Sequence, residues 1–186
     1  YAADRSFKEY TVRSIYYDTP KLDDYRDKIE GLKIRKKIRI RAYNELCTDS
    51  RVFLEVKRKY ENHISKNRAP LLFANLEEVL TSIEFQNLLL KKRGYINTSD
   101  DAAKFFFHFR NKSSHPIVLV VYEREAFFSK FDSTLRITFD KNLRSLAFPS
   151  LHDIYNETNL KPAMHGHFIL EIKFYDGFPL WFQKII

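Results

Sequence analysis

Along much of this chain, charged and aliphatic residues alternate at every second position. This is the pattern of a β-strand with one polar face and one apolar face. The clearest run is 33–43, in which Lys37, Arg39 and Arg41 alternate with Ile38 and Ile40. The run lacks the 3.6-residue apolar period of a helix and is rich in β-branched residues, so it predicts a strand with a strongly basic face.

A second basic strand is predicted at 51–59, after a short polar loop. Here Glu55, Lys57 and Lys59 share one face, and Leu54 and Val56 form the other. Two such strands side by side would bring many cationic groups to one face of a sheet. The same alternation recurs further along the chain.

Further strands are predicted at 10–18, 118–127, 135–140, 142–148 and 167–174, with a turn at 140–142. Their polar residues also gather on single faces, in the sets Tyr122 with Arg124, Arg136 with Thr138 and Asp140, and Glu171 with Lys173. The segment 60–68 is polar and reads as a connection that carries Lys66 and Arg68.

Helices are predicted at about 20–29, 75–93 and 100–111, and a further one begins near 176. Pro20 suits a first helical turn, and Asn75 suits a helix cap. The phenylalanines between Phe105 and Phe109 are expected to pack in the core. Strands interspersed with a few helices predict an α+β fold in one domain, residues 1–186.

The composition points to an anionic partner. The chain of 186 residues has a formal net charge of +8 and a pI near 9.4, which suits nucleic acid, anionic lipid, a nucleotide or a phosphate polymer. The basic faces carry charged or small neighbours rather than stacking aromatics, so we expect no nucleic-acid partner. Cys47 is the only cysteine, which excludes an intrachain disulfide and favours a reducing, cytoplasmic location. No apolar run is long enough to span a bilayer, although membrane partners are compatible with the sequence.

Two arrangements of the charged faces are compatible with the periodicity. They can be the wet side of an ordinary half-buried sheet. They can instead line a hydrated tunnel inside a closed antiparallel barrel, with counter-charges such as Glu55 and Glu171. Arginine at 39, 41, 124 and 136 favours phosphate or carboxylate ligands, because its planar guanidinium binds them through two hydrogen bonds.

A series of short motifs along nearly the whole chain resembles the polyphosphate polymerase domain of the vacuolar transporter chaperone (VTC) type, in the triphosphate tunnel metalloenzyme superfamily. In order, they are Val12-Arg-Ser-Ile-Tyr-Tyr-Asp18, Lys37-Ile-Arg-Ile-Arg-Ala-Tyr43, Phe53-Leu-Glu-Val-Lys57, Lys66-Asn-Arg68, Tyr122-Glu-Arg124, Leu135-Arg-Ile137 and Leu170-Glu-Ile-Lys173. Each motif alone is weak, but their order is specific.

The resemblance implies an antiparallel β-barrel tunnel with helices packed outside. It implies phosphoryl transfer from ATP or another nucleoside triphosphate to a growing polyphosphate chain, with Mn²⁺ or Mg²⁺. The implied phosphate-binding catalytic residues are Arg39, Arg41, Lys57, Lys66, Arg124 and Arg136. Tyr122, Lys173 and Glu55 are implied as further substrate-binding residues, and Glu171 as the metal ligand.

The chain also departs from the family pattern. Phe53 stands where the broader superfamily has the first glutamate of a Glu-x-Glu-x-Lys signature. An early strand with a tunnel lysine would precede Tyr1, and a last helix with a Ser-Lys element would follow Ile186, so the domain is expected to lack both. Triphosphate hydrolysis and non-catalytic sensing of polyphosphate or nucleotide are the alternative functions. Oligomeric state does not follow from the sequence.

Overall fold

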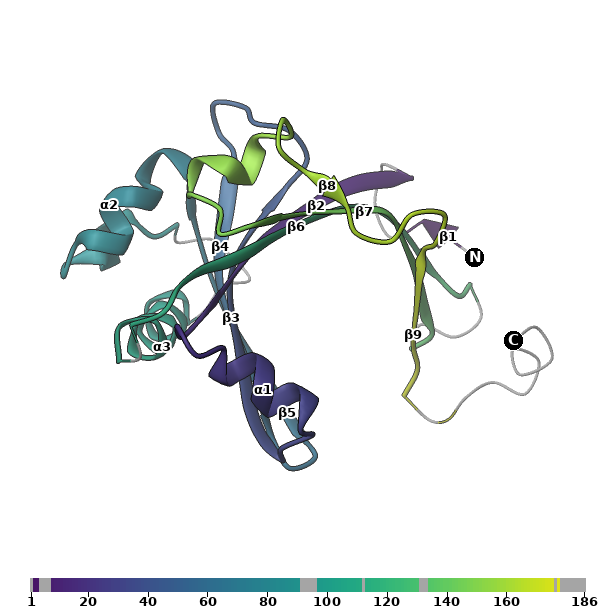
Figure 1. Ribbon diagram of the computed structural model, residues 1–186, viewed down its shortest axis with the longest axis horizontal. Coiled ribbons are helices and arrows are strands. Elements are labelled where there is room, and N and C mark those ends of the chain that lie inside the picture. The colour runs from purple at the N-terminus through teal and green to yellow at the C-terminus, as the bar shows by residue number, and fades with distance from the viewer. Residues whose placement is uncertain are drawn as a thin grey trace.

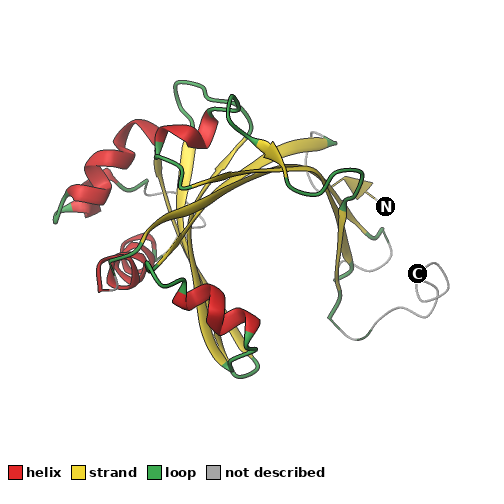
Figure 2. Cartoon of the chain, in the orientation of Figure 1, coloured by secondary structure: helices red, strands yellow, loops and turns green. Residues whose placement is uncertain are grey.

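The structure, a computed structural model, describes residues 2–3, 8–90, 97–111, 113–130, 134–175 and 177. Long antiparallel strands are the main secondary structure of these residues, and a few helices accompany them (Figure 2). The strands are β1 (Ala2–Ala3), β2 (Glu9–Asp18), β3 (Ile34–Tyr43), β4 (Arg51–Tyr60), β5 (His63–Leu72), β6 (His115–Phe128), β7 (Arg136–Ala147), β8 (Lys161–Pro162) and β9 (Ile169–Lys173). The α-helices are α1 (Asp23–Ile29), α2 (Leu76–Thr81) and α3 (Thr98–Asn111), and the 3₁₀ turns are Phe73–Asn75, Phe85–Leu88 and His152–Tyr155. The predicted α+β class is confirmed.

The described strands form one antiparallel sheet in the order β5-β4-β3-β2-β6-β7-β8, with β1 beside β6 and β9 beside β7. The sheet arches strongly (Figure 1). Strands β3, β4 and β5 form one limb of the arch, and β9 lies on the opposite limb with the paired portions of β6 and β7. This curvature gives the sheet an inner and an outer face.

The closed barrel expected from the sequence is wrong, because the sheet has two free ends. Within the described residues, β5 pairs with the strand β4 alone, and neither β8 nor β9 reaches it. Alternation of residues determines which side chains share a face, but it carries no information on whether the outermost strands pair. The tunnel is therefore replaced by an open arch.

Apolar side chains fill the outer face of the β3–β5 limb, where α2 and α3 lie (Figure 1). Ile38, Ile40, Leu54 and Val56 are fully buried there, as the alternation predicts. Phe105 of α3 joins this core with the apolar residues of α2. The predicted outer position is thus confirmed for α2 and α3, and the predicted core role is confirmed for Phe105, Phe106 and Phe109, whereas Phe107 is exposed. The charged face of the same strands is left on the inside.

Three predicted elements differ in the structure. The segment assigned as a polar connection, 60–68, contains most of β5, whose first half is exposed and therefore shows no apolar alternation. The helix expected at 75–93 ends at Thr81, because Ser82 is extended, and continues only as the turn Phe85–Leu88; residues 91–93 lie outside the described residues. The two strands expected around a turn at 140–142 form one strand, β7, in which Asn142 has a φ of 48° near a register shift. The predicted helix after 176 lies outside the described residues.

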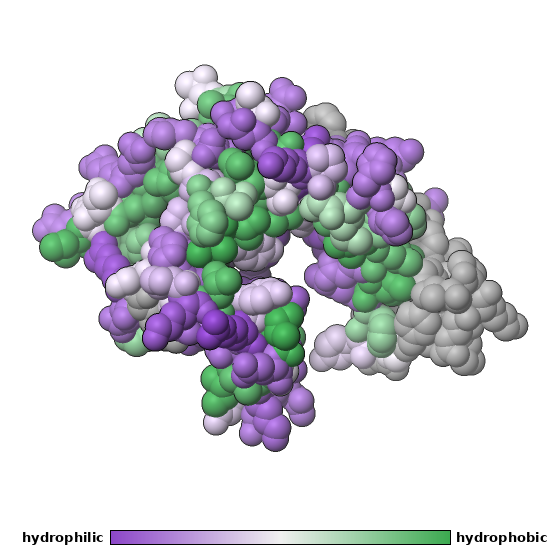
Figure 3. All heavy atoms as spheres, viewed as in Figure 1, coloured by the Kyte–Doolittle hydropathy of each residue, from purple (hydrophilic) through white to green (hydrophobic). Residues whose placement is uncertain are grey.

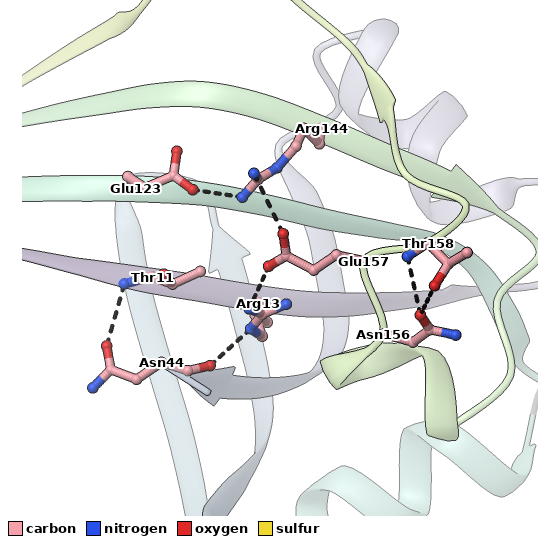
Figure 4. Close-up of polar contacts among 8 residues, drawn as sticks. All are labelled: Thr11, Arg13, Asn44, Glu123, Arg144, Asn156, Glu157 and Thr158. Carbon is pink, nitrogen blue, oxygen red and sulfur yellow. Dashed lines mark hydrogen bonds and ion pairs between the residues drawn. The ribbon is translucent and has the colours of Figure 1, made fainter. Parts of the chain in front are cut away.

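Not every arginine faces inward. Arg13, whose side chain is 4% exposed, lies on the outer face and binds Glu157 at 2.5 Å and the carbonyl oxygen of Asn44 at 2.8 Å (Figure 4). Arg144 contacts Glu123 at 2.5 Å and Glu157 at 3.5 Å (Figure 4). This paired cluster fastens the segment around Glu157 to β2 and β7, so these two arginines have a structural role.

Candidate functional site

The strand register places the predicted basic residues on one face of the sheet. Residues directly opposite each other on antiparallel strands project to the same side. Across β2 and the β3–β5 limb, the opposed positions form two rows. The first row holds Tyr16, Arg39, Glu55 and Arg68, and the next holds Lys37, Lys57 and Lys66. These rows lie on the face opposite Ile38 and Leu54, which is the inner face of the arch.

The same face continues onto the other limb. Tyr10 of β2 is opposite Arg124, which is opposite Asp140, and Val12 is opposite Tyr122. Thr138 is opposite Glu171, and Arg136 is opposite Lys173. The structure therefore brings every predicted site residue to the inner face, where basic side chains outnumber acidic ones: Lys37, Arg39, Arg41, Lys57, Lys66, Arg68, Arg124, Arg136 and Lys173 against Glu55, Asp140 and Glu171. Figure 3 shows an open hollow between the two limbs.

Glu55 lies at the centre of the basic cluster on the β3–β5 limb, with its side chain 1% exposed. Its Oε2 accepts a hydrogen bond from Nε of Arg39 at 2.7 Å and lies 4.0 Å from Nε of Arg41. Its Oε1 lies 2.9 Å from Nζ of Lys66 and 3.1 Å from Nε of Arg68. One carboxylate is thus shared by four cations, so the cluster keeps a large positive excess.

The cations around Glu55 stabilise its ionised form. Burial by itself would raise the pKa of this carboxyl, but the charges of Arg39, Arg41 and Lys66 outweigh burial and lower the pKa to about 2. Glu55 is therefore ionised at neutral pH and organises the surrounding cations. A phosphate arriving at this cluster would meet side chains that are already positioned.

The lysine row beside this cluster has fewer counter-charges. Lys57 lies directly between Lys37 and Lys66, although like charges at opposed positions destabilise a sheet. Lys37 and Lys57 are both exposed, and neither makes an ion pair within the described part of the chain. Partial burial, together with the charges of Lys28 and Lys57, lowers the pKa of Lys37. An anion with several negative charges would relieve this repulsion.

Two residues of the cluster were absent from the predicted site. Arg68 contacts Glu55, donates to the hydroxyl of Tyr43 at 3.1 Å and lies with Cζ 3.6 Å from the ring centre of Phe53. Tyr16 accepts a hydrogen bond from Arg39 at 3.1 Å. Burial would raise the pKa of Tyr16, but Arg39 and Arg41 lower it. The alternation Lys66-Asn-Arg68 carried a signal for Arg68, whereas Tyr16 required knowledge of the register.

Arg124 forms the centre of the second limb. Its Nε and Nη2 donate to the two carboxylate oxygens of Asp140, each at 2.6 Å, and its guanidinium lies 5.2 Å from the ring centre of Tyr122. The hydrogen bonds to Asp140 raise the pKa of Arg124 against the effect of burial. Tyr122 is buried among Tyr10, Val12 and Ala126, and burial raises its pKa to about 12. The ring of Tyr122 therefore packs against the guanidinium of Arg124. Asp140 is a further residue of the candidate site that the sequence analysis did not identify.

Glu171, the predicted metal ligand, lies on β9 of this limb with its side chain 41% exposed. It is 3.7 Å from Nη2 of Arg124 and 3.5 Å from Nζ of Lys173, and Thr138 donates to it at 3.5 Å. No group of three or more metal-ligating residues occurs among the residues that the structure describes. An exposed carboxylate with long, weak contacts fits a hard cation that takes its other ligands from phosphate oxygens and water, rather than a cage made by the protein alone.

The fold is a curved antiparallel sheet with α2 and α3 on its outer face and an inner face rich in basic side chains, whose chemistry suits a polyanion. The family model for the VTC domain matches residues 1–186, the whole chain, so the chain belongs to the VTC domain family. That family is associated with polyphosphate synthesis, which agrees with the chemistry of the inner face. No curated protein matches the sequence. In the described part of the chain, no helix combines the length and apolarity needed to cross a membrane.

Proposed function

We propose that the inner face binds a nucleoside triphosphate, with ATP as the natural donor, and transfers its terminal phosphoryl group to inorganic polyphosphate. The observation that carries this proposal is the register, which places the basic residues of six separate strands, β3, β4, β5, β6, β7 and β9, on one face. Membership of a family associated with polyphosphate synthesis supports the same substrate class.

Phosphoryl transfer requires little covalent participation by the protein. Phosphoryl transfer needs the attacking and leaving oxygens in line and the charge on the equatorial oxygens neutralised. Arg39, Arg41 and Lys57 would hold the donor phosphates, and Lys66 would complete the same cluster. A terminal oxygen of the acceptor forms the new P–O bond while the bond between the β and γ phosphates breaks, and the nucleoside diphosphate leaves. Fixed guanidinium groups are suited to this task because they need no rearrangement as charge develops.

The second limb supplies the remaining contacts. Arg124 and Arg136 would bind the far end of the phosphate string, while Asp140 and Tyr122 keep Arg124 oriented. Lys173 offers a further, exposed cation. Glu171 would hold Mn²⁺ or Mg²⁺ together with phosphate oxygens, and the ion when bound would neutralise negative charge on the transferred group.

One alternative has structural support. The described sheet is open, so water has access to the inner face, as hydrolysis of a triphosphate would require. Non-catalytic sensing would need only the binding of the triphosphate. A polymerase must instead favour a phosphate acceptor over water. The three functions share the same binding residues and differ in the fate of the terminal phosphate.

The test is to incubate the protein with ATP and Mn²⁺ and to follow long-chain polyphosphate, free phosphate and bound ATP. Long chains that depend on Arg39, and that persist when the exposed Lys104 of the outer helix α3 is changed to alanine, support the proposal. Removing one such contact should slow transfer by about 100-fold. Free phosphate without polymer would assign a hydrolase, and ATP binding without either product would assign a sensor; both results overturn polymerisation.

A further inference from the structure

A cavity of about 330 Å³ lies beside the inner face, at the end of β2. It is enclosed by α1, by the edge of β3 that extends beyond β2, and by the start of β6. Its walls are mainly aromatic and aliphatic, from Tyr16, Tyr17, Leu22, Tyr25, Ile38 and Val118. This volume is near the lower end of the range typical of small-molecule sites, about 300–1,000 Å³.

The position of α1 keeps this cavity open. Asp18, at the end of β2, accepts hydrogen bonds from the backbone N–H groups of Asp24 at 3.0 Å and Tyr25 at 2.9 Å. Asp24 in turn forms an ion pair with Lys36 of β3. The helix is therefore fixed at its start to two strands, and the space beneath Tyr25 is preformed rather than created by a ligand.

The cavity is continuous with the basic cluster. Tyr16 lines its wall, and the hydroxyl of the same residue accepts a hydrogen bond from Arg39. Lys37 also lines the cavity and stands directly opposite Lys57 in the lysine row. An apolar hollow thus adjoins Lys37 and Lys57, neither of which forms an ion pair with another described residue. This arrangement suits a ligand with one apolar part and one polyanionic part.

The geometry points to a nucleoside subsite: the base and ribose of the donor occupy this cavity, and its phosphates extend over Lys37 and Lys57 toward Arg39. This inference rests on the proposed function and adds which end of the inner face takes the donor. Inorganic polyphosphate has no apolar part to fill the cavity, so the subsite distinguishes the nucleotide donor from the phosphate acceptor. The acceptor is left with the more distant cations of the arch.

The test compares the affinities of ATP and inorganic tripolyphosphate by titration calorimetry for the wild type and three variants. Leu22→Trp fills the cavity, and Tyr25→Ala removes part of its wall. Tyr60→Ala is the matched control, because Tyr60 has a similar exposure (61% against 57% for Tyr25) and does not line the cavity. We expect the first two variants to weaken ATP binding by about tenfold, the effect of losing part of a buried ring.

Tripolyphosphate is the internal control for folding, and its affinity should stay within about twofold in all three variants, since no apolar contact is involved. Unchanged ATP affinity in Leu22→Trp and Tyr25→Ala, with normal tripolyphosphate binding, would overturn the nucleoside subsite and leave the proposed function standing. Failure of the wild type to bind either ligand would overturn the proposed function, and the subsite with it.

Discussion

Glu55 shows how a single carboxylate can organise a basic site. It lies within 4.0 Å of the side-chain nitrogens of Arg39, Arg41, Lys66 and Arg68. Removing one member of a buried ionic cluster leaves the other charges uncompensated, which costs far more than the loss of an exposed pair. The site therefore depends on Glu55 for its stability as well as for its geometry.

We predict that Glu55→Gln lowers the free energy of unfolding by about 3 kcal/mol, measured by urea titration at pH 7. The variant is nearly isosteric, so the loss reflects charge rather than packing. The matched control is Glu171→Gln, whose side chain is 41% exposed and which should change stability by less than about 1 kcal/mol. Equal effects of the two substitutions would contradict the central role of Glu55.

The lowered pKa of Glu55 predicts a pH dependence of stability. The folded-state pKa is about 2, below the ordinary 4.5. A carboxyl with a depressed pKa contributes its full stabilisation above the unfolded pKa and loses it as the pH falls toward the folded value. The stability difference between wild type and Glu55→Gln should therefore shrink between pH 4.5 and pH 2 in urea titrations. A constant difference across that interval would refute the assignment.

At the residue scale, the sequence predicted which face of a strand a residue lies on better than it predicted which side chains that residue contacts. Alternation placed Arg39, Arg41 and Glu55 on one side of their strands, and the structure agrees. It did not identify Tyr16 or Asp140 as partners of Arg39 and Arg124, because their contacts depend on strand register between distant segments. The substrate-binding role of Tyr122 stays a prediction; its packing against Tyr10 and Val12 of β2 also depends on the register.

At the scale of elements, the helices α2 and α3 determine which face of the sheet remains available. They cover the apolar side of β3, β4 and β5, and α3 packs directly on β4 and β5. Long, regular strands were predictable from their sequence period. The strand β5 was missed because its first half is exposed on both faces, and the helix at 75–93 was overextended because an apolar stripe does not reveal where the backbone becomes extended.

Phe105 provides the test of this packing. It is fully buried and stacks on Phe109 with ring centres 5.4 Å apart, whereas Phe107, two residues away on the same helix, is 62% exposed. Phe105→Ala should destabilise the protein by about 3–5 kcal/mol, because it leaves a cavity in the core. Phe107→Ala should change stability by less than about 0.5 kcal/mol. Chemical unfolding of both variants measures the difference in the free energy of unfolding. A larger loss of stability for Phe107→Ala would show that α3 packs its opposite face against the core.

At the scale of the whole molecule, the arch concentrates charge that is dispersed in the sequence. Basic residues on β3, β4 and β5 are separated from those on β6, β7 and β9 by the helical segment, yet the shared inner face unites them. The sequence predicted that these basic residues share one face, but it wrongly predicted a closed barrel. Closing the barrel requires the two outermost strands to pair, and the alternation of polar and apolar residues carries no information on that pairing. The net charge of +8 alone would favour any polyanion, so only placement distinguishes a specific site from general attraction.

The most direct test of this placement compares two double variants of equal net charge in titrations with tripolyphosphate. Lys37→Ala with Lys57→Ala removes two cations of the inner face, and Lys104→Ala with Arg110→Ala removes two exposed cations of α3, which packs on the outer face. Charge-assisted contacts contribute about 1.5 kcal/mol each, so the inner-face variant should bind about 100-fold more weakly, whereas the outer variant should stay within about threefold of the wild type. Equal losses in the two variants would show that binding follows total charge, and would contradict a phosphate site on the inner face.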